Sequence, residues 1–70
     1  MKPYMERLTS LLKKELPSVS ITLRECPDGD TLVIFNMEGI IKATVFKYIE
    51  AEEMSLFDKI TTEAKEMYSL

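Results

Sequence analysis

The 70-residue chain has no histidine, no tryptophan and one cysteine, Cys26. A single cysteine cannot form a disulfide within the chain, and without histidine a zinc site lacks its usual ligand set. Cys26 also lacks the histidine partner that activates a cysteine as a nucleophile. The sequence therefore predicts no enzymatic activity, no catalytic residue, no metal site and no cofactor.

Glycine is also scarce, because the chain has only Gly29 and Gly39, and both fall in predicted turns. No glycine-rich loop is left to cradle a phosphate. The segment Asp28-Gly29-Asp30 resembles the start of a calcium-binding loop, but Gly39 stands where the twelfth position of such a loop needs a glutamate. We interpret this segment as a tight turn.

Long apolar runs are absent as well: the longest has about four residues, whereas roughly 20 are needed to cross a membrane. The N-terminal Met1-Lys2-Pro3-Tyr4 leads into charged residues and not into an apolar signal segment. The expectation is a cytoplasmic protein without a membrane segment. The net charge of −3 makes the protein acidic and argues against a nucleic-acid partner.

The middle of the chain carries the pattern of three strands joined by two turns. Apolar and polar residues alternate from Ser18 to Glu25, which is typical of a half-buried strand. The following Cys26-Pro27-Asp28-Gly29 predicts a type I turn with a bulge at the glycine, and a second strand is expected over Thr31 to Met37. This turn would set Leu23 opposite Val33.

The third strand is expected from Ile40 to about Ile49. Before it, Asn36-Met37-Glu38-Gly39 predicts a second turn of the same kind, which would set Phe35 opposite Ile41. One face of the sheet would then carry nine apolar residues and no charge, namely Val19, Ile21, Leu23, Val33, Phe35, Met37, Ile41, Ala43 and Val45. A one-residue slip in this hairpin would place Phe35 opposite Lys42 instead.

Amphipathic segments on either side of the strands predict two helices. Residues 3 to 16 carry apolar side chains three and four positions apart, and Pro17 ends this helix. The second helix occupies the C-terminus, and its apolar stripe consists of Phe57, Ile60, Ala64 and Met67. Two starts are open for it: a first turn over Glu50 to Glu53, or Ser55 as the cap with Asp58 three residues on.

The predicted fold class is α+β: one domain over residues 1–70, with a helix, a three-stranded antiparallel meander and a helix in two layers. This order of elements is also that of double-stranded RNA-binding domains, without their sequence motifs. That family opens its second helix with lysines that contact phosphates, whereas this chain has Glu50, Glu52 and Glu53 there. A shared topology does not give a shared function.

The sheet face turned away from the helices is the candidate site. Under the predicted register it gathers five apolar residues, Leu32, Ile34, Ile40, Phe46 and Tyr48. Such a cluster exceeds the scattered apolar residues of an ordinary surface. Two alternatives are open at this point: a helix could cross to this face, or the residues could simply be exposed.

We therefore hypothesise a small interaction or regulatory module that forms a homodimer, or binds another protein, through this sheet face. The alternative is a nucleic-acid-binding module. It would use Phe46 and Tyr48 to stack on bases, with Arg24 and Lys42 nearby to contact phosphates.

Overall fold

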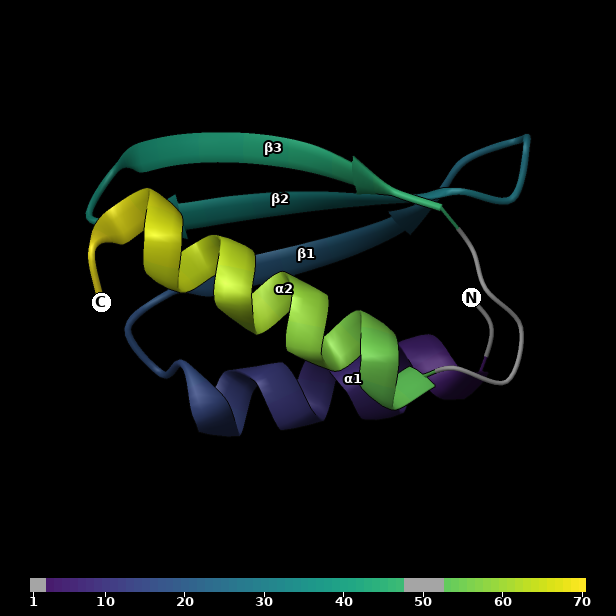
Figure 1. The fold of residues 1–70 in the computed structure, drawn as a ribbon, viewed down its shortest axis with the longest axis horizontal. Helices are drawn as coiled ribbons and strands as arrows, with labels where there is room; N and C mark the ends of the chain where they lie inside the picture. The colour runs from purple at the N-terminus through teal and green to yellow at the C-terminus, as the bar shows by residue number, and fades with distance from the viewer. Residues whose placement is uncertain (1–2, 48–52) are drawn as a thin grey trace.

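The computed structural model describes residues 3–47 and 53–70 (Figure 1). Its helices and strands are α1 (Pro3–Glu15), β1 (Ser20–Glu25), β2 (Thr31–Met37), β3 (Ile40–Phe46) and α2 (Glu53–Tyr68). The three strands form one antiparallel sheet in the order β1-β2-β3. The predicted α+β arrangement of helix, meander and helix is confirmed.

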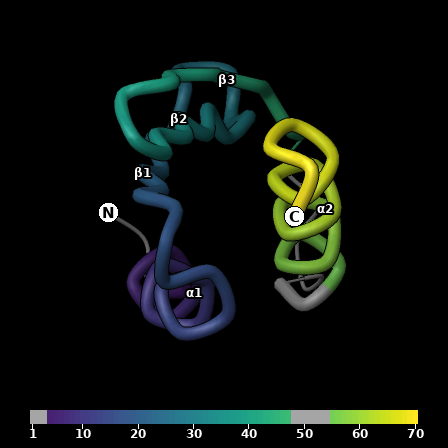
Figure 2. The backbone as a smooth tube through the Cα atoms, turned by 90° about the vertical axis from the view of Figure 1, so that its left-hand side faces the viewer, coloured from purple at the N-terminus to yellow at the C-terminus, as the bar shows by residue number. Residues whose placement is uncertain are grey.

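Both helices lie on the same side of the sheet, so the fold has two layers (Figures 1 and 2). α1 packs against β1 and α2, and α2 packs against β2. Between the layers lies one core, made of Met5, Leu8, Leu12, Leu16, Val19, Leu23, Val33, Phe35, Leu56, Ile60 and Ala64. The alternative in which a helix crosses to the other face of the sheet is wrong.

α1 follows its predicted pattern except at Leu11, which the three- and four-residue spacing places in the apolar stripe. Its apolar stripe recurs every three or four residues and is buried at Met5, Leu8 and Leu12, whereas Leu11 points outward and is 39% exposed. The N–H of Leu16 still donates to the carbonyl of Leu12 at 2.8 Å, and Pro17 prevents a further turn. The helix thus ends within one residue of the predicted position.

α2 begins at Glu53, so Ser55 lies inside the helix and is not its cap. Ile60 and Ala64 of the predicted stripe are fully buried, and Phe57 and Met67 pack against the core from its margin. The helix stops where Ser69 adopts a φ of 55° and the N–H of Leu70 donates to the carbonyl of Lys65 at 2.9 Å.

The first hairpin has the predicted turn and register. The N–H of Cys26 donates to the carbonyl of Asp30 at 2.8 Å, and the N–H of Gly29 donates back to the carbonyl of Cys26 at 2.9 Å. Gly29 has a φ of 93°, which is accessible to glycine because it has no Cβ. Leu23 lies opposite Val33, as expected.

The second hairpin differs from the prediction by one residue. Met37 pairs with Ile40, so the loop consists of Glu38 and Gly39 alone. Their φ values of 53° and 86° are those of a type I′ turn, whose twist matches that of the flanking strands. The side chain of Asn36 accepts a hydrogen bond from the N–H of Gly39 at 3.0 Å.

This shift turns β3 over relative to β2, so the predicted pairing of Phe35 with Ile41 is wrong. Phe35 lies opposite Lys42 instead. Ile41, Ala43 and Val45, which the sequence pattern assigns to the core, lie on the outer face of the sheet, away from the helices. Ile41 is 65% exposed and Val45 is 56% exposed.

Ile40 and Phe46, which the sequence pattern assigns to the outer face, lie on the side of the helices instead. Phe46 packs against the core, whereas Ile40 is 54% exposed and Lys42 is exposed. The helices therefore cover this side of β3 only in part. Because register is fixed firmly only where one face of a strand is buried, the core does not impose the pairing that the apolar pattern predicts.

Candidate functional site

The outer face of β2 and β3 carries a continuous set of apolar side chains. We call it the outer apolar patch; its members are Leu32, Ile34, Ile41, Ala43 and Val45. Leu32 lies opposite Val45, and Ile34 lies opposite Ala43, so the side chains adjoin across the two strands. No charged side chain stands among them.

The patch has a polar border on β1. Ser20, Thr22 and Arg24 share its face and are exposed. Within the patch, exposure increases from β2 to β3: Leu32 and Ile34 on β2 are half-buried, whereas Ile41 and Val45 on β3 are exposed. Neither α1 nor α2 covers this face, since both lie on the opposite side of the sheet (Figure 2).

Two of the five predicted site residues, Leu32 and Ile34, lie in the patch. Ile40 and Phe46 lie on the opposite face, and Tyr48 falls outside the described residues. The sequence reasoning missed the three patch residues of β3, because it assigned them to the core. The signal that could have identified them is the short loop before β3, since a two-residue hairpin at Glu38-Gly39 gives the observed register.

Hydrogen bonds connect the last turn of α2 to the start of β3, on the face of the sheet that the helices cover. The hydroxyl of Tyr68 donates to the carbonyl of Ile40 at 2.7 Å. The amine of Lys42 donates to the carbonyl of Met67 at 3.4 Å and lies 5.9 Å from the centre of the Tyr68 ring. Lys42, the one charged residue within β3, is therefore directed toward α2 and away from the patch.

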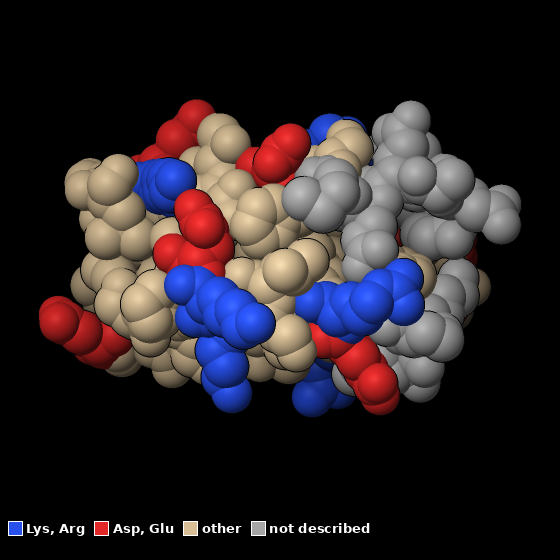
Figure 3. All heavy atoms as spheres, turned by 90° about the horizontal axis from the view of Figure 1, so that it is seen from below, with Lys and Arg blue, Asp and Glu red and all other residues tan. Residues whose placement is uncertain are grey.

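The side chains considered for nucleic-acid binding do not share one surface. Arg24 projects from the outer face of the sheet, whereas Lys42 and Phe46 project from the face toward the helices. On the side of the molecule formed by α1, lysine and arginine side chains lie next to acidic ones (Figure 3). That surface has a mixed charge, in contrast to the basic stripe that typically follows a phosphate backbone.

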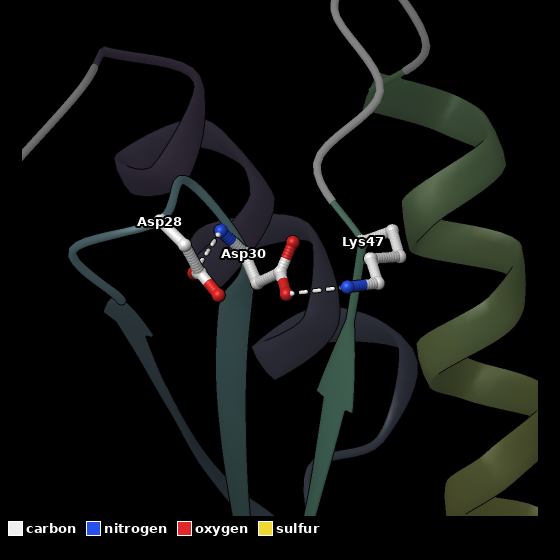
Figure 4. Close-up of polar contacts among 3 residues, drawn as sticks. All are labelled: Asp28, Asp30 and Lys47. Carbon is white, nitrogen blue, oxygen red and sulfur yellow. Dashed lines mark hydrogen bonds and ion pairs between the residues drawn. The ribbon is translucent and has the colours of Figure 1, made fainter.

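The carboxylates of the first turn are engaged within the fold (Figure 4). Asp28 accepts a hydrogen bond from the N–H of Asp30 at 3.1 Å, which shapes the turn. Asp30 forms an ion pair with Lys47 at 3.1 Å, and this hydrogen bond raises the pKa of Lys47. Within residues 3–47 and 53–70, no three His, Cys, Asp or Glu side chains are placed to hold a metal ion.

A shallow hollow of about 540 Å³ lies where the end of α1 meets the start of β1 and the second turn. Its lining is Thr9, Lys13, Pro17, Ser18, Val19, Ser20, Ile21, Asn36 and Glu38. Lys13 and Glu38 are the charged members of that lining, and both are exposed. The hollow therefore offers surface polar groups to a ligand but no desolvated one.

In comparisons with known proteins, the chain matches no protein-family model, no curated protein and no solved structure. The candidate site therefore rests on the geometry of the chain itself. Among the described elements, neither α1 nor α2 is long and apolar enough to span a membrane.

Proposed function

We propose that this chain is a small protein-interaction module without catalytic activity, which self-associates through the outer apolar patch. A symmetric dimer is the simplest closed assembly that one surface can form. The observation that carries the proposal is the patch itself: five adjoining apolar side chains on a sheet face that neither described helix covers.

The exposure within the patch supports a contact with protein. Ile41 and Val45 are 65% and 56% exposed, although residues of this kind are usually buried. Contiguous apolar surface on a soluble protein is characteristic of an interaction site. Its burial would contribute about 25 cal/mol per Å², set against the loss of translational and rotational freedom on association.

The size of the domain supports association as well. A chain of 70 residues buries only about 60% of its unfolded surface on folding, and its stability is correspondingly small. Small domains commonly gain stability from disulfides, metals or oligomerisation. With Cys26 as a free thiol, this chain builds its core without a disulfide, which is usual in a reducing compartment, and we propose a cytoplasmic location.

The experiment compares two lysine substitutions on the same sheet face. Ile41→Lys places a charge inside the patch, whereas the control Thr22→Lys places one at an exposed position of the polar border. Circular dichroism should show that both variants fold, since neither residue belongs to the core. In sedimentation, the wild type and Thr22→Lys should associate as concentration rises, and Ile41→Lys should remain monomeric.

Two results would contradict the proposal. One is a wild-type chain that stays monomeric at every concentration reached in sedimentation. The other is a folded Ile41→Lys variant that associates as strongly as the wild type, because the contact would then lie elsewhere on the molecule.

A further inference from the structure

The register of the second hairpin determines which backbone groups of β3 point away from the sheet. Met37 and Ile40 flank a two-residue loop, so they form a hydrogen-bonded pair, and such pairs alternate along an antiparallel ladder. The N–H and C=O groups of Lys42, Thr44 and Phe46 therefore face β2. Those that face outward belong to Ile41, Ala43 and Val45, the patch residues of β3.

β3 is an edge strand of the sheet in the described part of the chain. It forms the upper margin of the molecule in Figure 1, and no described helix or strand lies beyond it. An edge of this kind presents unpaired donors and acceptors, which are a template for a further strand. β3 contains no proline and no bulge that would prevent such pairing.

We propose that two copies of this chain join β3 to β3, antiparallel, about a twofold axis at Ala43, so that their sheets become one continuous sheet. This inference rests on the self-association proposed above and places its contact at the margin of the patch, where Ile41, Ala43 and Val45 pair with the second copy while Leu32 and Ile34 stay on the open face. The occupant of the free edge is thus a second copy of the same strand, in a defined register.

The sequence of β3 is self-complementary in this register. Ala43 lies opposite Ala43 of the second copy, and Ile41 lies opposite Val45, so every outward-facing residue finds a partner. On the outer face, Ile41 and Val45, which are 65% and 56% exposed, then pack against each other. On the side of the helices, Lys42 lies opposite the uncharged Thr44.

The neighbouring registers are less favourable. An axis at Lys42 would set the two lysines directly opposite each other, which is destabilising for like charges. An axis at Thr44 would set Phe46 opposite Lys42 and would leave only Ala43 and Val45 as bonded pairs. The electrostatic and hydrogen-bonding terms therefore favour the same axis, at Ala43.

Edge pairing also has a consequence for the outer face. The patches of the two copies meet at the twofold axis and form one apolar surface that is uninterrupted by charge. Lys42 does not obstruct this contact, because its amine bonds the carbonyl of Met67 on the other side of the sheet.

Engineered disulfides test the register directly, in a background with Cys26→Ser that removes the native thiol. Hydrogen-bonded partners across an antiparallel pair have Cα atoms about 5.5 Å apart, a separation that a disulfide can span. Under mild oxidation Ala43→Cys should form a covalent dimer by itself. A mixture of Ile41→Cys and Val45→Cys chains should also cross-link, whereas each of these two alone should not, since its own copies would lie about 15 Å apart.

A proline substitution tests whether association depends on backbone pairing at the β3 edge, and it needs no engineered cysteine. The N–H of Ala43 faces outward, so Ala43→Pro removes no bond to β2, and proline is tolerated on edge strands. The variant should fold and lose association. Ala43→Val keeps the N–H while adding bulk, and it should associate as the wild type does.

The outcomes separate this inference from the proposed function. If Ile41→Lys abolishes association while a folded Ala43→Pro retains it, or if the mixed cysteine variants fail to cross-link, edge pairing is wrong and self-association through the patch stands. If the wild type is monomeric, both fail. Should Ala43→Pro fail to fold by circular dichroism, the cysteine mixture decides the register.

Discussion

Thr31 carries a polar group at a place where the core is otherwise apolar. It is the first residue of β2, its side chain is on the side of the helices with Val33 and Phe35, and it is 1% exposed. Its hydroxyl has no hydrogen-bond partner among the described residues. A buried hydroxyl without a partner loses its hydration and gains nothing in return, which is unfavourable for the stability of a fold.

Thr31→Val should therefore stabilise the protein by about 1 kcal/mol, since it keeps the shape of the side chain and removes the unpaired group. The measurement is the free energy of unfolding in urea. Thr61→Val is the matched control, because the buried hydroxyl of Thr61 donates to the carbonyls of Phe57 and Asp58, both at 3.0 Å. There the same replacement should be neutral or destabilising; equal effects at both positions would show that the unpaired hydroxyl is not the cause.

At the scale of elements, the parts of the fold that the sequence predicts are those for which it contains one dominant signal. α1 has an apolar stripe ended by Pro17. The first hairpin has Pro27 and Gly29 at positions that suit only one common turn, and its register follows from that turn. In both elements, local chemistry and the burial of one face favour the same structure.

The second hairpin lacks that agreement. Asn36 followed by Gly39 fits a longer turn, whereas the observed two-residue loop places Glu38 at a φ of 53°, a conformation that residues other than glycine seldom adopt. The core constrains this end of β3 only weakly, since Ile40 and Lys42 on the side of the helices are exposed and Phe46, at the far end, packs against the core. The count of apolar residues on one face therefore favours a register that the structure does not have.

The same difference in register changes which residues of β3 belong to the candidate site. An apolar outer face over β2 and β3 is predicted from the sequence, and so are its members on β2, Leu32 and Ile34. Its members on β3 are the alternate set, because a one-residue change of register exchanges the faces of a strand. Ile41 and Val45 thus move from the predicted core to the outer face, where they are 65% and 56% exposed.

A pair of alanine substitutions tests the register of β3. Phe35 is fully buried at the centre of the sheet, so Phe35→Ala should cost about 3–5 kcal/mol and unfold much of the protein. Ile41 is 65% exposed, so Ile41→Ala should change the stability by no more than about 0.5 kcal/mol. Urea unfolding of dilute samples, where association does not contribute, gives both values. A loss of about 2 kcal/mol or more at Ile41 would favour the register in which Ile41 faces the core.

At the scale of the whole molecule, the two faces of the sheet are covered unequally. The two helices cover one face of the sheet, and the apolar residues on the other face are left to solvent. The chain has a radius of gyration of 11.3 Å, and 11 apolar residues of its described part form the core. A domain this small has little stability in reserve, so a second copy that binds only the folded chain should contribute measurably to it.

The thermal midpoint of the wild type should therefore rise with protein concentration. Raising the concentration to about 100 times the dissociation constant adds about 2.7 kcal/mol per dimer by mass action, which for a domain of this size corresponds to about 5–10 °C. Ala43→Pro, which lacks an outward-facing N–H at the centre of the β3 edge, should have a midpoint independent of concentration. Calorimetry over a wide range of concentrations measures both. If the wild-type midpoint does not move, the folded chain gains nothing from a second copy, and neither the patch nor the edge of β3 joins two chains.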